Sequence, residues 1–266
     1  MQFDKEKIKK EVISYILIFL GVFGFKSTFF EPNHIPSGSM LPTMAIGDFI
    51  LVNKFSYGLK LPFSEWVIVK RMLGREDAIY LTEFTPPKKG DIIVFEYPED
   101  RDILFVKRVV ATPGDEIQVT ENRVFLNGKE IIGEEQPQKP SIDLYDYPRV
   151  PMDMRFLKVN SGETSHIIGH NLVYPPPGRK KNQESIKVPK DHVFVMGDNR
   201  DFSSDSRFWG FVPYTHLRGK AMFVWFNMVY PWSEEPFHFR PARIGTSFGS
   251  LNEAPKAKND KKPAKK

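Results

Sequence analysis

A long apolar segment lies near the start of the chain. Residues 12–25 read VISYILIFLGVFGF and carry no charge, and after Lys26 the apolar character resumes at Phe29 and Phe30. As a helix, residues 12–30 would be about 28 Å long at 1.5 Å per residue, close to the roughly 30 Å hydrocarbon core of a bilayer. The pattern predicts a transmembrane anchor over residues 12–30.

The flanks of this segment indicate its orientation. Four lysines stand between residues 5 and 10, and cytoplasmic flanks are rich in Lys and Arg, so residues 1–11 are the expected cytoplasmic tail and the rest lies outside. A cleavable signal peptide and a buried core helix are the alternatives. No small-x-small cleavage site follows in FKSTFFEPN, and Lys26 can extend its amine to the interface, so the anchor is favoured.

Beyond residue 30, short apolar runs alternate with Gly, Pro, Asn and Asp. This texture is typical of antiparallel β-structure. The clearest runs are GDFILVNKF, GDIIVFEYP, ILFVKRVV, EIQVTENRVFLNGKEI, DHVFVMGDN and KAMFVWFNMVYPW. The last is interpreted as a buried strand, with a membrane-touching surface as the alternative. A helical period appears weakly within residues 64–83, where Gly74 interrupts it.

The predicted fold is therefore mainly β, with an N-terminal transmembrane helix before an antiparallel β domain that carries an inserted subdomain. Residues 133–190 are rich in Pro and show little strand pattern, which indicates an insertion between core strands. From about residue 246 the chain is polar and Lys-rich, as in disordered tails. The predicted divisions after the anchor are residues 31–118 and 193–245 for the two parts of the β domain, 119–192 for the insert and 246–266 for the tail.

Composition narrows the function classes. The chain has no cysteine, so disulfides, zinc–thiolate sites and thiol nucleophiles are excluded. The formal net charge is +5, but much of the excess lies in the lysines of the two ends. The middle is close to neutral, and no nucleic-acid-binding stripe is expected in it.

A first candidate for chemistry is the stretch Ile35-Pro36-Ser37-Gly38-Ser39-Met40-Leu41-Pro42-Thr43. If the segment is extended, Ser37 and Ser39 point to the same face, because side chains alternate along a strand. One hydroxyl then attacks a carbonyl, while the other joins the Ser39 backbone N–H in stabilising the oxyanion that forms. A simple turn with no catalytic role explains the same residues equally well.

The second candidate is Lys107. In a strand, Ile103, Phe105, Lys107 and Val109 share one face, so the lysine is the one polar group on an apolar stripe. A free lysine titrates near 10.4 and is a poor base at neutral pH, whereas burial disfavours the ammonium and lowers the pKa. The alternative is a lysine that extends from the edge of a strand into solvent.

The third candidate is GDNRDFSSDSRFWG, residues 197–210, which directly follows an apolar run. Its density of Asp, Ser and Arg is costly to bury unless the groups pair with one another. A solvated turn is the alternative reading of this segment.

Taken together, these stretches resemble the type I signal peptidases, the bacterial leader peptidases. The resemblance rests on an N-terminal anchor followed in order by PSGSMLPT, GDFILVNKFSYG, GDIIVF with VKRVVATPGD, and GDNRDFSSDSRFWGFVP. It covers the anchor, residues 31–58 and 89–116, and residues 193 to about 230. It does not cover residues 59–88, which stay a candidate for a second membrane contact, nor the insert or the tail.

The resemblance implies a role for each matching residue. It makes Ser39 the nucleophile, Lys107 the general base, Ser37 the side-chain donor of the oxyanion hole with the Ser39 backbone N–H, and Ser203 the residue that orients the lysine. Asp198, Asp205 and Arg207 correspond to supporting residues. The small pockets for Ala-like residues before the cut are expected to be walled by Ile35, Pro36, Met40, Phe105 and Val106.

The resemblance further implies a serine endopeptidase of the bacterial cytoplasmic membrane that removes signal peptides from secretory preproteins. The expected topology is a single pass, with the N-terminus in the cytoplasm and the catalytic domain outside. The expected partners are preproteins with small residues before the cut and membrane lipid, not nucleic acid. No cofactor and no metal are implied.

Other functions fit the residues less well. For a Ser-His-Asp hydrolase, His34 lies near Ser39 but outside any triad-like motif, and no G-x-S-x-G elbow is present. For a metalloprotease, HIIGH at residues 166–170 lacks the Glu of H-E-x-x-H. A repressor-type autopeptidase has no use for an anchor. A non-catalytic, membrane-anchored β scaffold fits the anchor and the strands, but it has no use for a desolvated lysine.

Overall fold

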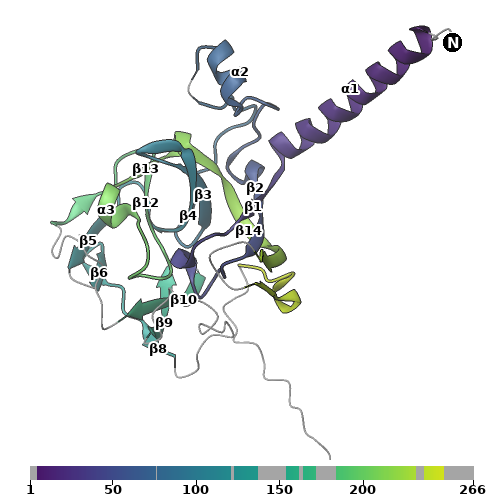
Figure 1. Cartoon of the computed structure of the whole chain (residues 1–266). Coiled ribbons are helices and arrows are strands. Elements are labelled where there is room, and N and C mark those ends of the chain that lie inside the picture. Colours follow the sequence, from purple (N-terminus) through teal and green to yellow (C-terminus); the bar gives the residue numbers. More distant parts are fainter. Residues whose placement is uncertain are drawn as a thin grey trace, which may run out of the picture.

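The computed structural model describes most of the chain. It covers residues 5–75, 77–120, 123–136, 154–161, 164–171, 184–231 and 237–248. A long helix projects from a β-rich body, which is built from one large and two small sheets (Figure 1). The fold is thus mainly antiparallel β, as the sequence predicted.

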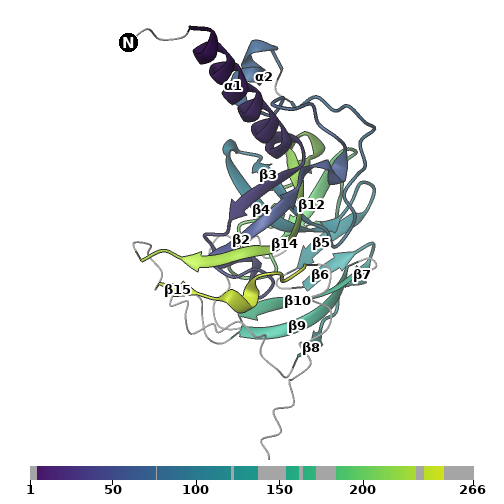
Figure 2. The same cartoon turned by 90° about the vertical axis from the view of Figure 1, so that its right-hand side faces the viewer.

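Helix α1 (Lys5–Thr28) contains most of the predicted anchor. The chain leaves the helix before residue 30, because Phe30 already begins strand β1. Apolar side chains between Val12 and Phe25 are exposed around the helix, and the helix packs on the body at its C-terminal end (Figures 1 and 2). Judged by length and apolarity together, none of the helices in the described ranges qualifies as a membrane span.

The large sheet has eight antiparallel strands and provides the frame of the site. Its strand order is β1-β2-β14-β3-β4-β12-β13, and β15 pairs with β14. The strands are β1 (Phe30–His34), β2 (Asp48–Asn53), β3 (Ile92–Tyr97), β4 (Asp100–Ala111), β12 (His192–Met196), β13 (Val212–Pro213), β14 (Leu217–Val229) and β15 (His238–Phe239).

Both faces of this sheet are buried around its central strand β3, which explains the unbroken apolar run there. In β3, Ile92 and Val94 pack with Met40 and Val52 on one side, while Ile93 and Phe95 pack on the other. Successive strand residues point to opposite faces, so a run such as IIVF needs a core on each side. The motifs GDIIVF and VKRVV therefore lie on adjacent strands of the large sheet.

Strand β14 is only partly the buried strand that KAMFVWFNMVYPW predicted. It runs between β2 and β3, and Ala221, Val224 and Val229 are buried, yet Met222 and Trp225 are exposed. The first residues of the predicted tail are ordered on the body. Residues 246–248 bond to β14, for example Val224 N to the Thr246 carbonyl at 2.9 Å. The remainder of the tail lies outside the described residues.

The predicted insert contains more strand than its sequence pattern indicated. Proline obscures the signal, yet the described parts form two small sheets, which pair β11-β5-β6-β7 and β10-β9-β8. The described part of residues 133–190 thus contains four strands, where the sequence showed little strand pattern. The strands are β5 (Glu116–Thr120), β6 (Arg123–Leu126), β7 (Lys129–Glu130), β8 (Glu134–Glu135), β9 (Met154–Ser161), β10 (Thr164–Asn171) and β11 (Ile186–Lys187).

Two short helices complete the described fold. Helix α2 (Val67–Met72) is all that forms of the weak helical pattern within residues 64–83, and Gly74 follows it with a φ of 62°. Helix α3 (Ser206–Trp209) is capped by the Asp205 side chain, which accepts from the Arg207 N–H. Short 3-10 turns lie at Gly38–Met40, Lys54–Tyr57, Tyr214–His216 and Pro241–Arg243.

Candidate active site

Ser39 lies on a tight turn rather than on an extended segment. Residues Gly38–Met40 form a 3-10 turn, and Ser37 is the extended residue before it. Two contacts from Asn199 hold the turn: its backbone N–H donates to the Ser39 carbonyl at 3.0 Å, and its Nδ2 donates to the Gly38 carbonyl at 3.0 Å. The side chain of Met40 is buried beneath. The extended conformation considered for this stretch is therefore wrong.

Lys107 lies next to this turn, in the middle of the large sheet on β4. Its Nζ is 2.9 Å from Ser39 Oγ and 2.9 Å from the Val106 carbonyl oxygen. The lysine is only 5% exposed, and the ring of Phe105 lies 5.1 Å from the amine. Strand β4 thus brings the two residues into hydrogen-bond contact although they are 68 positions apart.

Burial makes Lys107 a stronger candidate for a base. Desolvation lowers the pKa of its amine from 10.5 to about 8, although the carboxylates of Asp205 and Asp198 act in the opposite direction. A lysine with a pKa near 8 has a sizeable neutral fraction at the pH of most enzyme reactions. The neutral amine can accept a proton from a hydroxyl in direct contact.

Ser37 lies on the solvent side of the same turn. Its Oγ is 3.5 Å from Ser39 Oγ, and its side chain is exposed. The two hydroxyls therefore converge despite the tight turn between them.

Asp198 is fixed by a residue that sequence reasoning did not single out, Arg108. The guanidinium donates to both carboxylate oxygens, at 2.8 Å and 2.6 Å, and the Thr43 hydroxyl donates to the same carboxylate. Burial alone would raise the pKa of Asp198, but Arg108 and these hydrogen bonds hold it below its usual value. The alternation of a strand offers a signal for Arg108, because the neighbour of an inward Lys107 must face the other side and find a partner.

Asp205 and Arg207 form a second buried pair. The guanidinium donates twice to the carboxylate, at 2.7 Å each, and the Gly197 N–H donates to the same carboxylate at 2.9 Å. A bidentate pair of this kind fixes both planes at once. It sets the path of the chain from Gly197 through Ser203 to helix α3.

Ser203 is buried in this turn, 4% exposed, and lies directly against Gly197. Within the described residues, the hydrogen bonds of the Lys107 amine go to Ser39 and Val106. Ser203 Oγ has no hydrogen-bond partner among the described residues, and burial raises the pKa of the nearby Asp205 to about 6. Contact between Ser203 and the lysine stays a prediction.

The expected pocket residues divide by exposure. Ile35 and Met40 belong to the buried core, and Phe105 and Val106 are half-buried beside the site. Pro36 is exposed next to Ser37. Their walling of a pocket stays a prediction.

The predicted insert reaches the site through β10. The Gly169 N–H donates to the Asp198 carbonyl at 2.8 Å, and the Arg200 N–H donates to the Gly169 carbonyl at 2.9 Å. His166 and His170 on the same strand are buried, and His166 Nε2 is 3.8 Å from Asp198. Burial lowers the pKa of His166 to about 3, so the imidazole is neutral. It lies beside Asp198. This contact could not be predicted from the sequence, because the Pro-rich flanks obscure the strand pattern.

Comparison with known proteins gives one consistent result. The family model described as signal peptidase, peptidase S26, matches residues 8–226. A signal peptidase I of Pseudomonas fluorescens is 35% identical to this chain, and the alignment covers 90% of the chain and 81% of the relative. A signal peptidase I of Pseudomonas aeruginosa is 34% identical, with 85% and 77% covered. One of Buchnera aphidicola subsp. Acyrthosiphon pisum is 32% identical, with 91% and 83% covered.

Proposed function

The chain belongs to the signal peptidase family, peptidase S26, and we propose that Ser39 and Lys107 carry out its chemistry. Its function is that of a serine endopeptidase that removes N-terminal signal peptides from preproteins. The observation that carries the assignment of residues is the 2.9 Å contact between Ser39 Oγ and a Lys107 amine that is almost fully buried.

In the first step, neutral Lys107 takes the proton of the Ser39 hydroxyl as Oγ attacks the carbonyl carbon of the scissile bond. The resulting oxyanion accepts hydrogen bonds from the Ser39 backbone N–H and the Ser37 hydroxyl. When the intermediate collapses, the Lys107 ammonium returns the proton to the leaving amine, and an ester on Ser39 remains.

In the second step, Lys107 takes a proton from water, which attacks the ester carbonyl. Collapse of this intermediate frees the signal peptide and returns the proton to Ser39 Oγ. Ser203, Asp198, Asp205 and Arg207 act as positioning residues in this scheme. Asp205 and Asp198 lie close enough to affect the pKa of the amine, and a rigid support keeps both reacting atoms in place.

The chain is expected to lie at the bacterial cytoplasmic membrane in a single pass. The apolar side chains exposed around α1 support this location, and the lysines before residue 11 support a cytoplasmic N-terminus. The catalytic domain is then on the outer side, where the cleavage region of a translocated preprotein emerges. Membrane lipid and secretory preproteins are its partners.

A non-catalytic scaffold is the weaker alternative. Burying an amine against a hydroxyl costs free energy through desolvation. A scaffold gains nothing from that cost, whereas a peptidase gains a base that works near neutral pH.

Cleavage of a preprotein is the direct test of the function. Full-length protein in detergent is expected to cut a secretory preprotein at one position. The residues just before that position are expected to be small. We expect Phe105 and Val106 to wall a pocket for small side chains, so a preprotein with Phe in place of the Ala before the cut is expected to react at least about a hundredfold more slowly. N-terminal sequencing of the product locates the cut. Equal cleavage of both preproteins would exclude the assigned pocket.

A further inference from the structure

Residues 59–81 form an excursion from the body that neither the catalytic site nor the sequence resemblance explains. Its stem is a short antiparallel pairing, in which the Leu61 N–H donates to the Ile79 carbonyl at 2.8 Å and the Leu81 N–H donates to the Leu59 carbonyl at 2.7 Å. Helix α2 lies at its tip, on the same side of the body as α1 in both views (Figures 1 and 2). The excursion is therefore a defined structure that stands beside the anchor helix.

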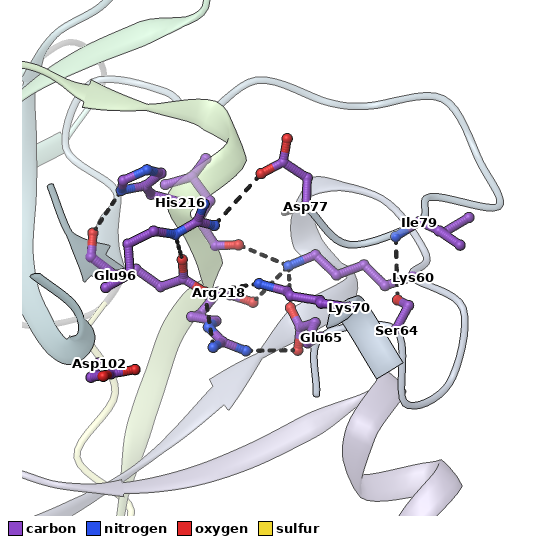
Figure 3. A network of polar contacts seen from close by, with 12 residues as sticks. Lys60, Ser64, Glu65, Lys70, Asp77, Ile79, Glu96, Asp102, His216 and Arg218 are labelled. Atoms are coloured by element: carbon purple, nitrogen blue, oxygen red, sulfur yellow. Dashed lines mark hydrogen bonds and ion pairs between the residues drawn. The ribbon is translucent and has the colours of Figure 1, made fainter. Parts of the chain in front are cut away.

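A buried network of charges fixes the excursion to the large sheet (Figure 3). Lys60 is 2% exposed, and its Nζ donates to Glu65 and to the Leu217 carbonyl at 2.8 Å. Arg218 on β14 lies 3.5 Å from Glu65 and 2.9 Å from Glu96. Glu96 also pairs with Lys70 of α2, at 3.4 Å. Buried charges that are all paired hold a segment in one position, because breaking a pair leaves an uncompensated charge.

The tip of this fixed segment exposes large apolar side chains. Trp66, Ile68, Met72 and Leu73 are 41%, 70%, 80% and 53% exposed, and we call these four residues the α2 crest. Large apolar side chains gathered on one exposed surface mark an interaction site. Because the network beneath is rigid, the crest is preformed and does not collapse onto the body.

The crest joins α1 at a defined level. The Phe63 N–H donates to Ser27 Oγ at 2.8 Å, and the Phe63 ring lies against Gly24 of the helix. Phe63 in turn stacks edge-on with Trp66, with 4.8 Å between ring centroids. Gly24 belongs to the apolar run 12–25. The crest therefore begins about one helical turn inside the end of α1, where a bilayer that surrounds α1 has its outer interface.

The charges around the crest match an anionic membrane surface. Arg71 and Arg75 are exposed on and just after α2. The acidic Glu65 is buried in ion pairs beneath, and Asp77 lies 3.5 Å from Arg101. Tryptophan prefers the interface, and nearby arginines attract anionic headgroups. A second copy of the chain or a preprotein offers neither the continuity with α1 nor this charge match.

We propose that the α2 crest is a second membrane-docking element, which inserts Trp66, Ile68, Met72 and Leu73 into the outer interface of an anionic phospholipid bilayer beside α1. This proposal rests on the proposed location of α1 and deepens the proposed function. Two attachments, the helix and the crest, restrict rotation of the body about α1. The Ser39–Lys107 site is then held at a constant orientation to the membrane from which a preprotein emerges.

A label on the crest tests the insertion without any reference to activity. The chain has no cysteine, so Met72→Cys carries a single environment-sensitive fluorophore, and Lys129→Cys, at the exposed start of strand β7, is the control. Full-length protein is reconstituted in vesicles of equal parts phosphatidylcholine and phosphatidylglycerol. The label at residue 72 is expected to shift to the blue and to be quenched by brominated acyl chains, whereas the label at 129 keeps its aqueous spectrum.

Three outcomes overturn the proposal. The first is an aqueous spectrum at residue 72 in vesicles. The second is a blue shift in detergent that grows with protein concentration, which indicates a second copy. The third is a blue shift that appears only after a preprotein is added, which indicates substrate docking. Each is read from fluorescence, so a chain that lacks peptidase activity still gives a decisive result.

A matched pair of variants tests the consequence for cleavage. Ile68→Asp with Met72→Asp is expected to slow cleavage of a membrane-inserted preprotein in these vesicles by about tenfold, and to leave cleavage of a short soluble peptide in detergent unchanged. Ile132→Asp removes an equally exposed apolar side chain elsewhere, 75% exposed, and is expected to change neither rate. Unchanged cleavage in vesicles by the double variant would contradict the orienting role of the crest.

Discussion

Ser39→Ala is expected to lower the rate of preprotein cleavage by a factor of about ten thousand or more, because the variant has no nucleophile. Lys107→Ala is expected to have an effect of the same size. The two residues act as one unit across the 2.9 Å contact, so the double variant is expected to be no slower than either single one. Cleavage of a preprotein by the full-length protein in detergent is the measurement.

Loss of activity in these variants is not expected to come from unfolding. The buried ammonium of Lys107 costs free energy at neutral pH, because its pKa is lowered by burial. Controls of the same chemistry are Ser204→Ala, an exposed serine next to Ser203, and Lys129→Ala at the exposed start of strand β7. Both controls are expected to cut at the parental rate. If Ser39→Ala or Lys107→Ala retains that rate, the assignment of the pair is wrong.

Gly197→Ala is expected to reduce cleavage by a factor of about one hundred or more, because a displacement of about 1 Å at the reacting atoms has a cost of that order. A Cβ at this position would lie 2.3 Å from Ser203 Oγ, 2.5 Å from Ser203 Cβ and 2.5 Å from the Ser39 carbonyl oxygen. None of these neighbours can move without shifting either the nucleophile turn or the chain that runs to Asp205. The added methyl group therefore displaces either the turn that carries Ser39 or the chain that runs from Gly197 to Asp205.

The control for this variant is Gly21→Ala, where an added Cβ meets nothing within 4 Å. It is expected to leave cleavage unchanged. Cleavage by Gly197→Ala within twofold of the parent would show that the nucleophile turn tolerates the displacement. In that case the contact between the 197–203 segment and Ser39 would not determine the position of the nucleophile.

The strands follow from local patterns in the sequence, whereas the roles of Ser39 and Lys107 were implied by the family resemblance. The apolar face of ILFVKRVV predicts a buried Lys107, and the structure has this lysine buried on β4. The serine turn needed tertiary information. An isolated PSGSM segment has no reason to form a 3-10 turn, and Asn199, 161 positions away from Gly38, closes it. Local patterns carry no information about such a partner.

The residues that hold Ser39 and Lys107 in place were harder to predict, because they act through ion pairs and hydrogen bonds between distant parts of the chain. Arg108 and Asp198 are 90 positions apart, and each has an ordinary surface role as the alternative. Strand β10 bonds to Asp198 and Arg200 through backbone groups. Every residue has these groups, so the amino-acid types do not predict the contact. The excursion at residues 59–81 was likewise hidden, because its fixed position depends on Lys60 and Glu65 meeting Arg218 from a distant strand.

The pH dependence of kcat/KM for a peptide without titratable groups tests the central claim, that a desolvated Lys107 is the base, most directly. The neutral amine is the active form, and its pKa is lowered to about 8. The rate is therefore expected to rise with pH, to reach half its maximum at about pH 8 and to level off above. A rate that still rises about tenfold per pH unit near pH 10 would mean that the base titrates like a lysine in water, and would contradict the account.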